Sequence, residues 1–128
     1  MSTVVPSLMI VMGLAMAATW TRDILAGEQV DLSAGVFRAR DGEAGTLFWP
    51  HWLAEYGTAF ALMVGGIGLF VDARWATAVA AVATGALLYT SVNSLGWALA
   101  NRERFPYALP MFAGLTVGIM TTVFLLLR

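Results

Sequence analysis

Four long stretches of this chain carry no charged side chain, and they limit its fold more than any other sequence feature. They are Thr3–Trp20, Tyr56–Val71, Trp75–Ala100 and Tyr107–Leu127. A run of about 20 apolar residues is enough for a helix to cross the hydrocarbon core of a bilayer. Hydrophobic residues make up 59% of the chain and charged residues only 12%, too few to cover a soluble fold. We therefore predict an integral membrane protein.

The predicted fold is all-α, a membrane four-helix bundle that forms a single transmembrane domain over residues 1–128. We expect spans at residues 4–21, 50–71, 75–100 and 107–127, with one long loop at residues 22–49. All five tryptophans lie at or near a span end, which is typical of the aromatic belt at a membrane interface. The first stretch lacks a preceding basic segment and is as long as a spanning helix. We therefore interpret it as a retained helix rather than a signal peptide.

The long loop allows two interpretations. Val36–Arg40 and Thr46–Trp49 flank Asp41-Gly42, a dipeptide that suits a type I′ turn, so the segment could form a β-hairpin. A loop of this length without structure would be unusual, so it could instead fold as a short cap over one membrane face. At the span ends, the pairs of charges at Arg22-Asp23 and at Arg102-Glu103 are expected to be solvated.

Small residues recur at helical spacing in every span. Because lipid provides no hydrophobic drive for helix association, such residues allow the close packing that holds helices together. They are Gly13 and Ala17, then Gly57, Ala61 and Gly65, then Ala81 and Gly85, and finally Gly114 and Gly118. We call each of these rows of small residues a ridge. The ridges indicate either packing within one chain or an interface between copies of the chain.

Charge and residue types exclude several function classes. The net charge of -1 leaves no basic footprint for nucleic acid, and the absence of cysteine rules out disulfides and thiolate chemistry. A single histidine cannot form an all-histidine metal site within one chain. Five arginines on the long-loop face against two on the other favour a cytoplasmic long loop. All basic residues are arginine and Ala and Gly are abundant, so we expect a multi-pass protein of a bacterial inner membrane.

Polar residues within the spans collect toward the long-loop face. With a rise of 1.5 Å per residue, Glu55 lies about 6 Å beyond His51, whereas Asn93 and Tyr89 lie roughly 10 Å and about 16 Å from the end of the third span. The residues expected to line a polar ligand-binding or coupling pocket there are His51, Glu55, Tyr56, Tyr89, Asn93 and Ser94. No catalytic residue and no metal ligand is predicted.

Each member of this set also has a structural interpretation. Glu55 is a functional candidate because an ionisable group within a span is costly unless it faces the bundle or water. His51 lies four residues earlier on the same helical face, where a protonated imidazole could hydrogen-bond the carboxylate. Alternatively, Glu55 is favoured by the dipole of a first helical turn, Asn93 joins helices by hydrogen bonding, and His51 is interfacial.

The stretch from His51 to Trp97 resembles the DoxX-like group of four-helix membrane proteins. The likeness consists of an acid early in the second span, a Gly-rich second half followed by a short polar turn with Arg74-Trp75, and an Ala-rich third span. It implies a small bundle with one polar-capped face, sometimes associated with quinone or redox partners. This chain differs by its long acidic loop and its lack of cysteine.

The sequence thus favours an accessory, non-catalytic membrane protein whose long-loop-side pocket binds a lipid, a quinone or a partner subunit. The alternative is a small oligomeric transporter or channel that uses Glu55 as its coupling group. An enzyme ranks third because the sequence shows no nucleophile–base pair, metal set or cofactor motif. The expected partners are the lipid bilayer and either further copies of the chain or a larger membrane complex.

Overall fold

The computed structural model describes residues 3–26, 30–31, 33–37, 49–100 and 102–128. Within these residues the fold has four α-helices: α1 (Val4–Ala26), α2 (Trp49–Phe70), α3 (Ala76–Ala100) and α4 (Ala108–Leu127). A short 3-10 helix, η1 (Arg102–Tyr107), precedes α4, and the strands β1 (Val30–Asp31) and β2 (Val36–Phe37) lie between α1 and α2. The all-α class is confirmed, and each of these four helices is long and apolar enough to cross a membrane.

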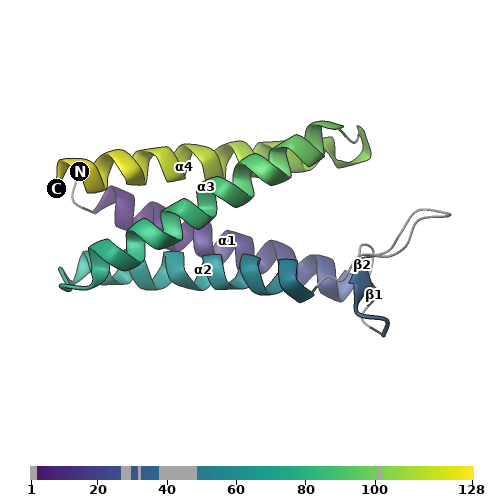
Figure 1. Cartoon of the computed structure of the whole chain (residues 1–128), viewed down its shortest axis with the longest axis horizontal. Helices are drawn as coiled ribbons and strands as arrows, with labels where there is room; N and C mark the ends of the chain where they lie inside the picture. Colours follow the sequence, from purple (N-terminus) through teal and green to yellow (C-terminus); the bar gives the residue numbers. More distant parts are fainter. Residues whose placement is uncertain (1–2, 27–29, 32, 38–48, 101) are drawn as a thin grey trace.

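The helices form two antiparallel hairpins, α1 with α2 and α3 with α4 (Figure 1). Helix α3 crosses from the end of α2 to the start of α4 and packs against both, whereas α1 and α4 touch much less. Both chain termini lie at one end of the molecule and the two strands lie at the other. The hairpins diverge toward the strand-bearing end, which we call the loop end.

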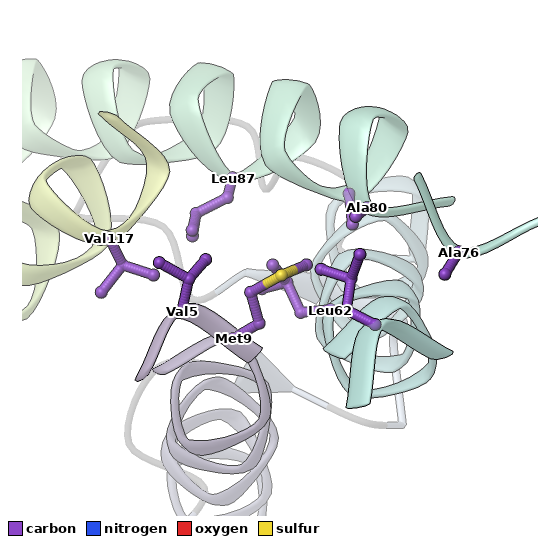
Figure 2. Packing of buried hydrophobic residues seen from close by; sticks show 9 residues of the cluster. Val5, Met9, Leu62, Ala76, Ala80, Leu87 and Val117 are labelled. Carbon is purple, nitrogen blue, oxygen red and sulfur yellow. The ribbon is translucent and has the colours of Figure 1, made fainter. Parts of the chain in front are cut away.

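The apolar core lies toward the end that holds the termini. Figure 2 shows side chains from all four helices meeting there, with Met9 of α1 between Val5 of the same helix and Leu62 of α2. Ala80 of α3 and Val117 of α4 complete the contact. Tight packing at this end leaves the loop end as the place where the two hairpins can separate.

Small residues make the helix contacts close. A Cβ added at Gly13 would lie 2.5 Å from the carbonyl oxygen of Ala59, and one at Gly114 would lie 2.5 Å from Oγ of Ser91. Both distances are too short for any side chain, so these ridges pack within the chain, as the first of the two interpretations predicts. Gly85 has no neighbour within 4 Å and faces outward, so the interface interpretation remains a prediction for the α3 ridge.

Helix α1 continues past the expected end of the first span at residue 21 and stops at Ala26. The sequence has no glycine or proline between Gly13 and Gly27, so nothing interrupts the helix earlier. The extra turn corrects the expectation of a solvated end, because Asp23 is only 8% exposed. The hydroxyl of Tyr107 donates a hydrogen bond to Oδ2 of Asp23 at 3.3 Å, which joins the end of α1 to η1.

The strand pairing differs from the expected hairpin. β2 pairs antiparallel with β1, which precedes it in the chain. Oδ1 of Asp31 accepts hydrogen bonds from both the N–H and the hydroxyl of Ser33, and Gly35 adopts a φ of 68° that suits glycine, so the turn closes early. Trp49 begins α2 instead of ending a strand. The expected turn at Asp41-Gly42 lies outside the described residues.

Candidate functional site

A cleft of about 80 Å³ lies between the two hairpins on the loop-end side of the core. Its walls are mainly apolar, with methionines Met12, Met16 and Met111 among them. Its polar lining residues come from α1, α2, α3 and η1: Thr19, Trp20, Glu55, Thr90, Ser91 and Tyr107. A mostly apolar cavity with a few convergent polar groups is the usual form of a small-molecule site.

Glu55 is the acidic group of this cleft. Its side chain is 8% exposed, and its Oε1 accepts a hydrogen bond from the hydroxyl of Thr90 on α3. Other helical threonines, such as Thr58 and Thr84, donate instead to the carbonyl four residues earlier in their own helix. Thr90 is directed away from its own backbone, so the bond between α2 and α3 is a tertiary contact that positions the carboxyl group.

His51 lies beside Glu55, one turn earlier on α2. Its Nε2 is 3.8 Å from Oε1 of Glu55, which is an ion-pair distance but too long for a hydrogen bond. The ring of Trp20 on α1 meets the His51 ring edge-on, with the centroids 5.1 Å apart. His51 therefore lies next to the carboxyl group but does not line the cleft.

Tyr56 faces α1, outside the cleft. Its hydroxyl lies 2.5 Å from Oγ1 of Thr21 and 3.5 Å from the carbonyl oxygen of Ala17. Its ring packs against Trp52, with the centroids 4.9 Å apart. The role that these contacts support is to hold α1 against α2 beside the site.

Tyr56→Phe is expected to lower the free energy of unfolding by about 1 kcal/mol, since it removes one hydroxyl hydrogen bond between α1 and α2. Unfolding of the purified protein in mild detergent, driven by added SDS and followed by circular dichroism, measures the change. Tyr89→Phe is the matched control because the Tyr89 hydroxyl has no hydrogen bond to a described residue. Equal losses in both variants would show that the contact with Thr21 adds nothing.

Besides His51 and Tyr56, three more residues of the expected pocket do not reach the cleft. Tyr89 is 76% exposed on the outer side of α3, Asn93 is exposed and Ser94 is half-buried, and none of them lines the cavity. The structure therefore does not bring these three residues to Glu55. The reason is helical phase: each residue turns the helix by about 100°, so Thr90 meets Glu55 while its neighbour Tyr89 faces outward.

Sequence reasoning left other lining residues out of the expected pocket. Thr90 and Ser91 directly follow Tyr89 in the chain but are not in the expected set, and Tyr107 appears there only as the start of a span. The sequence does indicate a methionine-lined wall, because Met12 and Met16 are four residues apart and so share one face of α1. Among the described residues, no group of three or more His, Cys, Asp and Glu side chains is placed to hold a metal ion.

The described part of the chain is thus a helical protein whose four long apolar helices enclose an acidic, mainly apolar cleft. A family model described as a domain of unknown function, DUF8058, matches residues 1–128, and the chain belongs to this family. No curated protein and no solved structure matches the chain.

Proposed function

We propose that this chain is an integral membrane protein, of the bacterial inner membrane, that binds a lipid-like or quinone-like amphiphile in the cleft between its hairpins. Its role is accessory and non-catalytic. The observation that carries the proposal is the cleft itself, in which apolar walls converge on the buried carboxyl group of Glu55. Such a site matches a molecule with an apolar body and one polar end.

The outer surface supports a membrane location. Large apolar side chains lie exposed along the helices, including Phe60 at 65% and Leu109 at 77%. Contiguous apolar surface of this kind is rare on soluble monomers but is the natural surface against lipid. The DoxX-like resemblance agrees with a small polar-capped bundle. Association with further copies or with a larger membrane complex stays a prediction.

The cleft opens sideways, between α1 and α4. Ala15 and Thr19 of α1 and Pro110 of α4 line the cavity and are also exposed. These two helices touch less than any consecutive pair of helices in the described chain. An amphiphile can therefore enter from the surrounding lipid without passing through the tightly packed core.

The second candidate is a small transporter in which Glu55 couples substrate movement to a proton or ion. It is favoured by one observation, the burial of a carboxyl group within an apolar helix, which is costly unless the group has a function. Flux in proteoliposomes that Glu55→Gln abolishes would favour this candidate. Unchanged flux would leave the binding role.

Ala15→Phe tests the proposed function. The added ring fills the lateral opening, so we expect an amphiphile that co-purifies with the natural protein to be lost at least about tenfold. Native mass spectrometry of the protein, released directly from membranes, identifies the ligand and its occupancy. Ala18→Phe is the matched control, because Ala18 is exposed on the same helix but does not line the cleft. A natural protein without ligand, or equal occupancy in both variants, would sink the proposal.

A further inference from the structure

One oxygen of Glu55 has no partner in the described chain. Thr90 and His51 both approach Oε1, and no contact to Oε2 exists among the described residues. The side chain is only 8% exposed and lines the cleft, but Oε2 is not among the described buried atoms that lack a hydrogen-bond partner, so it keeps some accessible surface. It is therefore available to a cleft ligand, and a hydrogen bond to a charged acceptor is stronger than one between neutral groups.

The described lining of the cleft carries one formal charge, the negative charge of Glu55. His51 beside it adds a positive charge only when it is protonated. The second carboxylate nearby, Asp23, accepts a hydrogen bond from the lining residue Tyr107. The closest cation to Asp23 in the described chain is Arg22, whose side chain is 78% exposed and whose Nε is 3.9 Å from Oδ1. The carboxylate of Glu55 therefore attracts a cation that enters the cleft and opposes an anionic head group.

The remaining lining suits an organic cation. Trp20 and Tyr107 place aromatic rings in the walls, and such rings attract ammonium groups through their negative faces. Met12, Met16 and Met111 supply flexible apolar side chains that adapt to ligands of different shape. The cleft therefore combines an anionic acceptor, aromatic rings and an adaptable apolar wall.

We propose that the cleft selects amphiphiles with a primary or secondary amine head group, an inference that rests on the proposed binding function. The ammonium group donates a hydrogen bond to Oε2 of Glu55 while Thr90 holds Oε1 in place. The alkyl chain lies along Met12 and Met111 and leaves between α1 and α4. Amphiphiles with an anionic head group are rejected, and those with a hydroxyl group bind more weakly because they lack the charge.

The test uses the purified full chain in phosphatidylcholine nanodiscs and three photoreactive probes. Each probe is a decyl chain with a diazirine, ending in an amine, a hydroxyl or a carboxylate, and labelling of α1 and α4 is quantified by mass spectrometry. We expect the amine probe to label the natural protein about tenfold more than either other probe, since hydrogen bonds to charged groups are the strong ones. Glu55→Gln should lower amine labelling to the hydroxyl level and lower hydroxyl labelling far less, because the amide oxygen still accepts a hydrogen bond.

Tyr89→Phe is the second variant, because Tyr89 is the neighbour of Thr90 but faces outward and does not line the cleft, and it should retain the preference for the amine. Equal labelling by all three probes, or amine labelling that Glu55→Gln leaves unchanged, would overturn the inference. If labelling by the probes still falls in Ala15→Phe but not in Ala18→Phe, the proposed binding function is retained and only the preference for the amine is lost. If no probe labels in a way that Ala15→Phe reduces, the binding function itself fails.

Discussion

Gly13→Leu is expected to lower the free energy of unfolding by about 3 kcal/mol, at the upper end of the usual cost of overpacking. A Cβ at this position would lie 2.5 Å from the carbonyl oxygen of Ala59 and 2.8 Å from Cγ of Met63. The carbonyl belongs to the backbone of α2 and cannot rotate away, so the two helices must separate. Unfolding by SDS, followed by circular dichroism, measures the loss.

Gly57→Leu is the matched control for this prediction. Gly57 lies on the exposed side of α2, and a Cβ there would meet nothing within 4 Å. The two variants add the same side chain and remove the same residue type, so they differ mainly in the contact between helices. If Gly57→Leu unfolds as easily as Gly13→Leu, the close approach of α1 and α2 is not what stabilises the fold.

Glu55→Leu is expected to have opposite effects on stability and binding. Without ligand, its free energy of unfolding should be about 1 kcal/mol higher than that of the natural protein. Replacing a buried ionisable group by an apolar one of similar size is often stabilising. Thr90 is then free to donate to the carbonyl four residues earlier, as Thr84 does. Labelling by the amine probe should fall at least about tenfold, because the anionic acceptor is gone.

Glu55→Gln serves as the control for the Leu variant, since it keeps a polar side chain that can still accept from Thr90. It should lose the preference for the amine without gaining stability. A Glu55→Leu protein that is less stable than the natural one would mean that the carboxyl group holds α2 to α3. The charge in the cleft would then have a structural role.

Depth along the helices was predictable, and direction around them was not. The uncharged stretches and the short turn before Trp75 placed Glu55 and Tyr89, the neighbour of Thr90, on the long-loop side of the bundle, because depth follows from counting residues at a constant rise. Which side of α3 faces α2 depends on how the helices pack, and that choice placed Tyr89 outside and Thr90 inside. This rotation explains why the expected residues of α3 lie outside the cleft.

Asp23 illustrates a second kind of missing information. Its neighbour Arg22 and its place after Trp20 made it look like a solvated helix end, and nothing local shows otherwise. It is buried because α1 continues past it and because Tyr107, distant in the chain, packs over it. A contact between residues so far apart depends on the arrangement of all four helices.

By itself, the sequence determined that the described chain forms four long apolar helices with polar residues gathered toward the loop end. Local hydropathy and turn residues are sufficient for that, since each helix satisfies its own backbone hydrogen bonds. Only the tertiary structure decided that the two hairpins pack tightly at the terminal end and diverge at the other. A Cβ at Gly65 of α2 would lie 3.1 Å from Cα of Ala80 on α3, so the hairpins approach closely there, and the cleft on the loop-end side holds the carboxyl group of Glu55.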